Sequence, residues 1–323
     1  MSASLNKDIL LAMSVPPFWH CGRTVRGNSL HTLAALAPAL LMSMLLWGLP
    51  SLRVAALAMF TSMLTEFLCQ KAMHRRCTQD DGTAAVTGMA FAFLLPAGAP
   101  WWLVVTGAAM GMGLGRMAFG GFGSNPVNAA LVGWALVFVS FPAHMDAMST
   151  MLMAEYADPL FRLKYFGADA VADIPLWQLL AGLQLGGLGS SQAGLLFLGG
   201  IYLIFRGVIR WEIASSFLLG TFITAGCFWA ADPSQYASPL FHICTGSTML
   251  AAFFLATEDS CCPHRRLPMF LYGLVGGALV VIIRIFGIYT DGAPFAVMLI
   301  NLLAPMFGLV KTRPFGMRKG GKR

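Results

Sequence analysis

Long apolar stretches alternate with short polar breaks along this chain and predict a protein built almost entirely of helices. A membrane-spanning helix needs roughly 17–25 mostly apolar residues, and most of the stretches approach or reach that length. The third stretch is short and lies between Gly82 and Pro96, which is typical of the broken helices that line sites in transporters. We expect about ten transmembrane helices, near Leu30–Leu49, Arg53–Ala72, Thr83–Leu95, Trp101–Phe119, Pro126–Phe141, Gln192–Val208, Glu212–Ala231, Pro239–Thr257, Pro268–Ile288 and Ala293–Lys311.

Composition places these helices in a membrane. Of the 323 residues 57% are hydrophobic and only 11% are charged, whereas a soluble domain carries roughly 25% charged residues. So few charges cannot cover so apolar a chain in water. The predicted fold class is therefore an all-α polytopic membrane protein. Residues 1–22 lack a continuous apolar signal core, so we expect the first helix to direct insertion.

The basic residues predict the orientation. With ten helices, most of the 21 lysines and arginines fall on one face, in loops such as 71–76 and 265–266 and in the tail 313–323. The positive-inside rule then places the N-terminal segment 1–29 and this tail in the cytoplasm. The net charge of +7 fits contact with anionic lipid or with an acidic partner subunit, and nucleic acid is not expected as a partner.

Two parts of the chain resemble each other. In the first part, TGMAFAFLLP at 87–96 is followed by an apolar helix and then by GGFGSNP. In the second part, STMLAAFFLA at 247–256 is followed by an apolar helix and then by FGIYTDG. A unit of five helices that occurs twice must be inverted in the membrane. We therefore expect two inverted five-helix repeats, at 30–145 and 191–312, joined by an exterior segment 146–190, with a shared site at their interface.

The segment Gly120–Pro142 begins with a glycine-rich polar loop and continues as an apolar helix. Asn125 is the predicted N-cap and Pro126 the predicted first-turn residue. Such a helix start can receive an anionic group. It can equally be a glycine-packed helix entry in a membrane bundle, and the residues alone leave both interpretations open.

Ionisable groups inside predicted spans are functional candidates. Glu66 in the second helix and Arg284 in the ninth are candidates for an ion pathway, and each can equally be a partnered structural charge. Asp291 begins a helix, where capping is the simpler role. His242 is more typical of a hydrogen-bonded core residue than of a ligand. No metal site is expected, because the cysteines and histidines near Cys261 lack a CxxC spacing.

Several motifs together carry a family resemblance. They are DGTAAVTG at 81–88, GGFGSNPVNAALVG at 120–133, STMLAAFFLAT at 247–257 and IRIFGIYTDGAPFAVMLIN at 283–301. The chain resembles the D subunit of Rnf-type electron-transport complexes over nearly its whole length. It resembles more distantly the B subunit of the sodium-translocating NADH:quinone oxidoreductase.

The resemblance implies a flavin-carrying subunit of the bacterial cytoplasmic (inner) membrane that is not catalytic alone. Its complex would couple electron transfer between ferredoxin and NAD to movement of Na⁺ or H⁺. The implied partners are iron–sulfur and flavin subunits of the complex.

The family's covalent flavin raises a conflict with this sequence. The usual member carries FMN linked through phosphate to a threonine in an S/A-x-A-T-P-L motif, and here the matching stretch 171–176 reads VADIPL, with Ile174 at the threonine position. Isoleucine has no hydroxyl, so covalent FMN is not expected. A flavin (FMN or riboflavin) would be held non-covalently by polar groups of the two inverted loops: Gly120, Gly121, Gly123, Asn125, Asn128, Asp291, Gly292 and Asn301.

Two alternatives remain beside the redox subunit. Inverted five-helix repeats also build channels, so a channel or transporter-like protein is the competing class. A structural subunit that has lost its flavin is the other. Co-purification of iron–sulfur and flavin subunits separates the first alternative from the redox complex.

Overall fold

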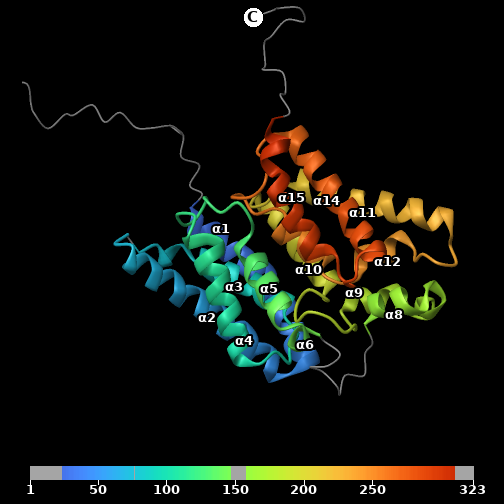
Figure 1. Cartoon of the computed structure of the whole chain (residues 1–323), viewed down its shortest axis with the longest axis horizontal. Coiled ribbons are helices and arrows are strands. Elements are labelled where there is room, and N and C mark those ends of the chain that lie inside the picture. Colours follow the sequence, from blue (N-terminus) through green and yellow to red (C-terminus); the bar gives the residue numbers. More distant parts are fainter. Residues whose placement is uncertain (1–23, 76, 147–157, 310–323) are drawn as a thin grey trace, which may run out of the picture.

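The computed structural model describes residues 24–75, 77–146 and 158–309, and all the regular structure within them is helical (Figure 1). Helix α1 (Val25–Trp47) starts earlier than expected because the Thr24 hydroxyl caps it, accepting from the backbone N–H of Gly27 at 3.1 Å. A hairpin at Gly48, whose φ is +72°, leads directly into α2 (Leu49–Ala72). Residues 1–23 of the expected N-terminal segment 1–29, and the tail 313–323, lie outside the described residues.

A short buried helix forms the centre of the first helical group. After a 3₁₀ turn (Gln79–Asp81), α3 (Thr83–Leu94) packs against α1, α2 and α5, and nearly all its side chains are buried. The predicted short third helix is therefore confirmed. Helix α4 (Trp101–Met112) continues as a π-helical turn (Gly113–Met117), and α5 (Ala129–Ser140) and α6 (Pro142–Met145) complete the group.

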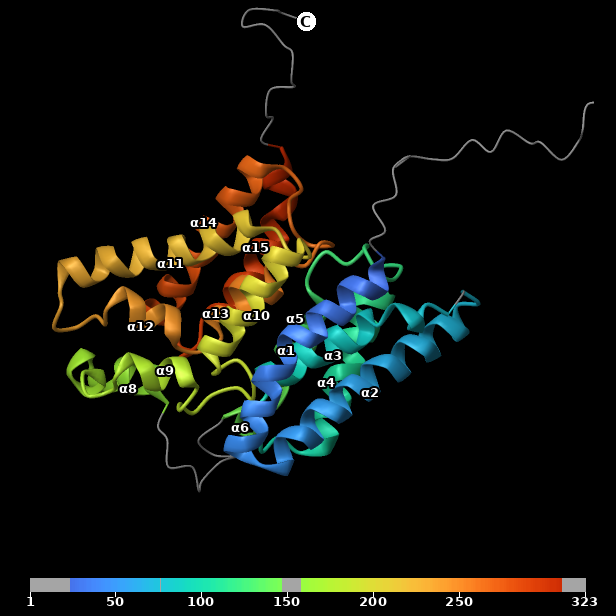
Figure 2. The same cartoon turned by 180° about the vertical axis from the view of Figure 1, so that it is seen from behind.

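The second helical group lies beside the first. It contains α10 (Ala193–Arg206), α11 (Trp211–Ala231), α12 (Pro239–Cys244), α13 (Thr248–Leu250), a π-helical turn (Ala251–Leu255), α14 (Arg266–Phe286) and α15 (Ala293–Gly308). Helix α10 packs along α1 between the two groups (Figure 2). The aromatic rings of Trp134 in α5 and Phe295 in α15 make a second contact between the groups, with centroids 4.9 Å apart.

The prediction of a continuous eighth helix, Pro239–Thr257, is wrong. The chain leaves the helix at Thr245 and re-enters it at Thr248, giving α12 and α13. Gly246 occupies the left-handed region, with φ of +62°, which favours glycine. The backbone groups freed by this break are bound by the side chains of Arg284 and Asp291, which belong to a distant part of the sequence.

The segment between the two groups contains α8 (Pro159–Phe166), a 3₁₀ turn (Ala168–Val171) and α9 (Leu176–Ala181), which lie next to α12 (Figure 1). Residues 184–192 then run into the protein and are largely buried. The backbone N–H groups of Leu188 and Ser190 donate to the carbonyls of Leu95 and Phe93, at 2.6 and 3.2 Å. These bonds satisfy carbonyls that the C-terminal end of α3 leaves unpaired.

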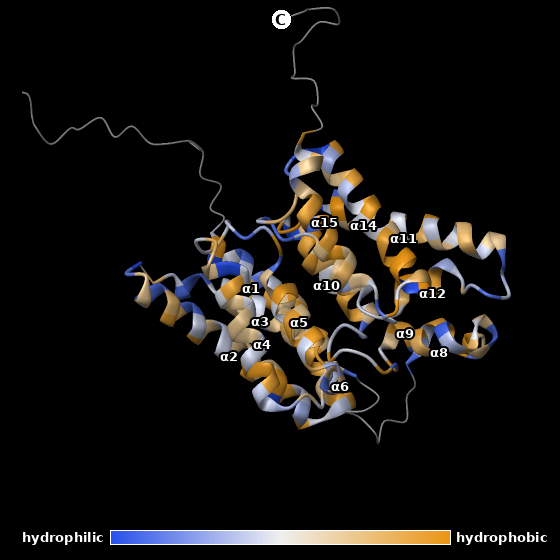
Figure 3. Cartoon of the chain, viewed as in Figure 1, coloured by the Kyte–Doolittle hydropathy of each residue, from blue (hydrophilic) through white to orange (hydrophobic). Residues whose placement is uncertain are grey.

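Four helices are long and apolar enough to cross a membrane, by length and composition: α1, α2, α11 and α14. Helices α3, α5, α10 and α15 are apolar but shorter. Apolar residues cover most of the ribbon, and hydrophilic residues gather at the loops and helix ends (Figure 3). The protein is therefore a multi-pass, all-helical membrane protein.

Helices α11 and α14 approach so closely that glycine is required between them. A Cβ at Gly277 would overlap the carbonyl oxygen of Phe217 and lie 2.6 Å from the backbone nitrogen of Thr221. We expect Gly277→Ala to lower the free energy of unfolding by about 2 kcal/mol, because backbone atoms must shift. Thermal unfolding in detergent measures this. Gly113→Ala, where a Cβ meets nothing within 4 Å, is the control. Equal melting temperatures of both variants would contradict the close packing.

Candidate functional site

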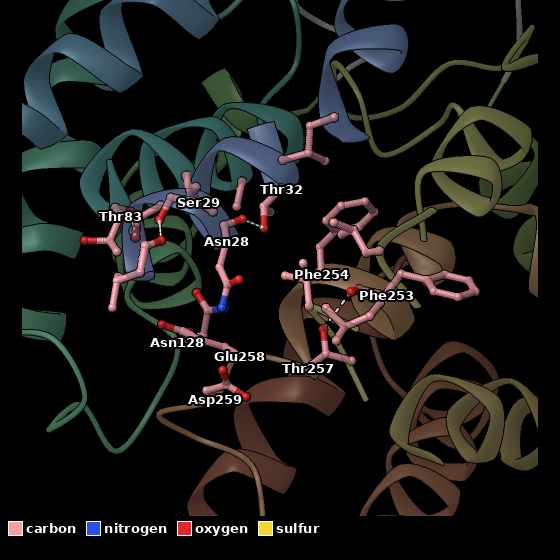
Figure 4. Close-up of a pocket in the computed structure, with 18 of the residues that line it drawn as sticks. Asn28, Ser29, Thr32, Thr83, Asn128, Phe253, Phe254, Thr257, Glu258 and Asp259 are labelled. Atoms are coloured by element: carbon pink, nitrogen blue, oxygen red, sulfur yellow. Dashed lines mark hydrogen bonds between the residues drawn. The ribbon is translucent and has the colours of Figure 1, made fainter. Parts of the chain in front are cut away.

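A cavity of about 230 Å³ lies between the two helical groups, at the N-terminal end of α3. We call it the Arg116 cavity. Neutral polar side chains from the first group line one wall, and the end of the π-helical turn 251–255 supplies the other (Figure 4). The lining side chains with hydrogen-bonding or aromatic groups are Asn28, Ser29, Thr32, Thr83, Thr87, Arg116, Phe122, Asn128, Phe253, Phe254, Thr257, Glu258 and Asp259.

Arg116 is the buried cation of this cavity, with 3% of its surface exposed. One of its terminal nitrogens donates to the Thr83 hydroxyl at 2.6 Å and lies 3.9 Å from the Glu66 carboxylate. Its Nε has no hydrogen-bond partner among the described residues. Gln70 donates to the same Glu66 oxygen at 3.3 Å. These contacts favour the partnered-charge interpretation of Glu66.

The glycine-rich loop leads into the same cavity, but the helix after it starts later than expected. Asn128 caps α5, since its side-chain oxygen accepts from the backbone N–H of Ala130 at 2.9 Å. The prediction that Asn125 is the N-cap is therefore wrong. The Asn125 side chain is buried and its amide donates to Glu258 at 3.3 Å and to the Val127 carbonyl at 3.2 Å. Pro126 consequently lies in the loop.

The three glycines give this loop its shape. Gly120, Gly121 and Gly123 have φ values of +114°, +108° and +89°, which side chains with a Cβ rarely adopt. Arg75 donates to the Gly120 carbonyl and fixes one end of the loop. Phe122 extends from the loop over Arg116, with the guanidinium 4.8 Å from its ring centroid. The glycines thus position Phe122 and do not line the cavity themselves.

A second cavity, of about 330 Å³, lies at the C-terminal end of α3 and the N-terminal end of α13. We call it the Asp291 cavity. Its walls carry the carboxylates of Asp146, Asp158 and Asp291. Burial raises the pKa of Asp158 to about 6. Aromatic side chains and the buried segment 184–191 complete the lining, with Trp134, Phe138 and Tyr289 among them.

Arg284 and Asp291 hold the broken helix together beside this cavity. Arg284 is 5% exposed and donates to the carbonyls of His242 and Thr245 at 2.7 and 2.9 Å and to the Thr248 hydroxyl at 2.7 Å. It also contacts the Asp291 carboxylate at 3.0 Å. Asp291 in turn accepts from the backbone N–H groups of Ser247 and Ala293. These bonds favour the structural interpretation of Arg284.

The two buried arginines have similar surroundings. Each lies at the C-terminal end of a long apolar helical segment, and each donates to the hydroxyl of a threonine that begins a short buried helix: Arg116 to Thr83 of α3, and Arg284 to Thr248 of α13. Each also has a carboxylate within 4 Å, Glu66 for Arg116 and Asp291 for Arg284.

The residues predicted to hold a flavin do not form one site. Asn128 lines the Arg116 cavity, whereas Asp291 lines the Asp291 cavity at the other end of α3. Gly292 packs against the Val280 carbonyl and Ile283, and Asn301 is buried in α15, where it accepts from the Tyr272 hydroxyl at 2.5 Å. Neither lines either cavity.

Ile174, at the position where the family resemblance implies a flavin-bearing threonine, is half-buried. It packs against a small apolar cluster that is separate from the main core, formed by Leu160, Val171, Leu179, Ala237, Phe241 and Cys244. Sequence reasoning also missed the polar residues of α1 at the Arg116 cavity. Asn28, Ser29 and Thr32 are three polar positions on one side of an apolar helix, and that spacing was the available signal.

Comparison with known proteins gives a consistent result over nearly the whole chain. A model of the NQR2, RnfD, RnfE family matches residues 12–316. The chain is 30% identical over 316 residues to the D subunit of the Na(+)-translocating ferredoxin:NAD(+) oxidoreductase complex of Acetobacterium woodii, and the match covers 97% of each chain. It is 32% identical over 348 residues to the D subunit of the ion-translocating oxidoreductase complex of Yersinia pseudotuberculosis, covering 95% of this chain and 98% of the relative.

A third relative, the D subunit of the ion-translocating oxidoreductase complex of Alcanivorax borkumensis, is 33% identical over 291 residues, with 82% of this chain and 85% of the relative covered. The expected resemblance to D subunits of Rnf-type complexes is thus confirmed. The chain belongs to the NQR2, RnfD, RnfE family.

Proposed function

We propose that this protein is the D-type membrane subunit of an Rnf-type complex that couples electron transfer between ferredoxin and NAD to movement of Na⁺ or H⁺. The observation that carries the proposal is the pair of cavities at opposite ends of α3, in a chain that matches D-type relatives along nearly all of its length. The other subunits of such a complex are its partners, and the subunit is not catalytic alone.

The two cavities support a route for the coupling ion between the helical groups. Ala90 lines the Arg116 cavity, and Leu94, about one turn further along α3, lines the Asp291 cavity. That spacing along a helix corresponds to about 6 Å. Phe91, Ala92 and Phe93, which lie between them in the sequence, are at most 1% exposed. A small movement of the short helices would be enough to connect the cavities, and broken helices commonly line such routes.

The finer architecture that we propose is ten transmembrane helices in two inverted five-helix repeats, with both termini in the cytoplasm. The matching arginine–threonine contacts of Arg116 with Thr83 and of Arg284 with Thr248 support the repeats, since each joins corresponding parts of the two groups. The clustering of basic residues on one predicted face supports the orientation in the bacterial inner membrane.

We further propose that the Arg116 cavity holds a flavin without a covalent bond. The aromatic rings of Phe122, Phe253 and Phe254 suit a flat heteroaromatic ring. Asn128 and the buried cation Arg116 line the same cavity and suit its hydrogen-bonding edge. When bound, the flavin would accept and pass on electrons. The protein's own contribution is to orient the ring and to exclude water with its apolar lining.

Filling the Arg116 cavity tests both the ion route and the flavin site that we propose. Thr87 lines this cavity, and we expect Thr87→Trp to weaken flavin binding by at least roughly tenfold, or about 1.4 kcal/mol, and to lower ion uptake. Membrane vesicles given reduced ferredoxin and NAD report uptake, and flavin released from the denatured protein reports binding. Thr106→Trp, on the exposed face of α4, is the matched control.

Three results would count against this proposal. Wild-type flavin content and uptake in Thr87→Trp would exclude the Arg116 cavity as the site. Ion or solute flux through the purified chain alone would favour the channel alternative. Absence of iron–sulfur and flavin subunits from the purified complex would do the same.

A further inference from the structure

A third cavity, of about 390 Å³, lies where α8, α12 and the C-terminal end of α14 meet. We call it the His242 cavity. Three basic side chains line it: Lys164 from α8, His242 from α12 and Arg284 from α14. Gln235, Tyr236 and Thr290 supply further polar groups. Neither the ion route nor the flavin site proposed above uses this cavity.

Two buried nitrogens at this cavity have no hydrogen-bond partner among the described residues. They are Nε of Arg284 and Nδ1 of His242, in side chains that are 5% and 2% exposed. An unpaired buried donor or acceptor is unfavourable, because it has lost its hydrogen bonds to water without gaining others. Lys164 is partly satisfied, since its ammonium group donates to the carbonyls of Gly287 and Tyr289, and one of its three protons remains.

The cavity's charge is positive. Among its described lining residues none is an aspartate or a glutamate, and Lys164 and Arg284 are cations. Asp291 contacts Arg284 through a terminal nitrogen and lines the Asp291 cavity on the other side, so the Nε keeps no partner of its own among the described residues. Arg284 is already paired with Asp291, so Lys164 supplies the unpaired positive charge. A cation beside unpaired nitrogens, in a lining without a carboxylate, suits an oxyanion, because charge-assisted hydrogen bonds are the strong ones.

We propose that the His242 cavity binds the phosphate group of a small phosphate compound or of an anionic lipid. Lys164 supplies the unpaired charge, and the free N–H groups of Lys164 and Arg284 donate to the phosphate oxygens. A free phosphate would fill only part of the cavity. The rest is lined by apolar side chains such as Leu163 and Phe286, which would accommodate a hydrocarbon portion. Phe286 is 71% exposed at the end of a candidate span, so lipid can reach the cavity from the apolar surface.

Thermal unfolding of the purified full chain in lipid-free detergent tests this proposal. Inorganic phosphate is added against chloride at equal ionic strength. In a second series, lysophosphatidic acid is added against monoacylglycerol with the same acyl chain. We expect phosphate, lysophosphatidic acid or both to raise the melting temperature. A response to phosphate assigns a soluble ligand, and a response to lysophosphatidic acid alone assigns a lipid headgroup.

Variants on α8 distinguish binding in this cavity from a general effect of positive surface charge. Lys164→Gln removes the half-buried cation, and we expect the concentration for half-maximal stabilisation to rise at least tenfold. Arg162→Gln, two residues away and exposed, is expected to respond as the wild type does. No stabilisation by either compound, or equal stabilisation of wild type and Lys164→Gln, would overturn the proposal. His242→Phe provides a second variant at the unpaired imidazole, with the same expected loss.

Discussion

Arg116→Met is expected to lower the free energy of unfolding by about 3–5 kcal/mol, because it leaves the carboxylate of Glu66 buried without its cation. Glu66 is 1% exposed, and its second oxygen has no hydrogen-bond partner among the described residues. The variant also removes the bond from Arg116 to the Thr83 hydroxyl at the start of α3. Since folded proteins are stable by only about 5–15 kcal/mol, we expect little folded protein from this variant.

A double variant distinguishes the effect of Glu66 and Arg116 on stability from their effect on function. Glu66→Met with Arg116→Met replaces both charges by apolar side chains of similar length, a change that is often neutral or stabilising. We expect it to recover most of the lost stability while remaining inactive in ion uptake. The control is Arg266→Met, which removes a side chain that is 92% exposed beside Glu212. Yield and melting temperature in detergent give the stability, and vesicle uptake gives the function.

If the double variant is as unstable as Arg116→Met, the isolated carboxylate is not the cause of the loss. If it is stable and translocates ions normally, neither charge takes part in the ion route.

The sequence predicts the helices of this protein well because their signals are local. Apolar stretches and their polar breaks gave nearly every long helix, and Gly82 and Pro96 bounded the short α3 correctly. The start of α5 was placed three residues early. Asn125 and Asn128 are equally suitable caps by residue type, and only the buried contacts of Asn125 with Glu258 and Val127 exclude it from that role.

The parts that sequence reasoning missed depend on contacts between distant residues. The break before α13 is marked by one glycine in an apolar stretch, and it is held by Arg284, about 40 residues later. The segment 184–192 contains the glycines and serines of an ordinary surface loop, yet it satisfies the carbonyls at the end of α3. Glu66 and Arg284 were identified as buried charges, but their partners, Arg116 and Asp291, required the fold.

A second prediction with a large expected effect concerns the covalent attachment of flavin. We expect the denatured wild-type protein to show no flavin fluorescence at its own mass on a gel viewed under ultraviolet light, because a phosphoester needs a hydroxyl at position 174. In the structure Ile174 packs against a small apolar cluster that includes Leu160 and Phe241. Asp173, beside it, would also repel a phosphate. Any flavin should instead appear in the soluble fraction after denaturation.

Ile174→Thr, co-expressed with the family's flavin transferase, is the informative variant. Replacing the ethyl branch of a half-buried isoleucine by a hydroxyl should cost about 1 kcal/mol, too little to unfold the protein, and thermal unfolding checks this. A fluorescent band in the variant alone would show that the exterior segment still accepts the transferase and that the missing hydroxyl is what prevents attachment. A band in the wild type would show that the attachment argument is wrong. The absence of a band from both proteins would favour the structural-subunit alternative, in which the protein has lost both its covalent flavin and its recognition by the transferase.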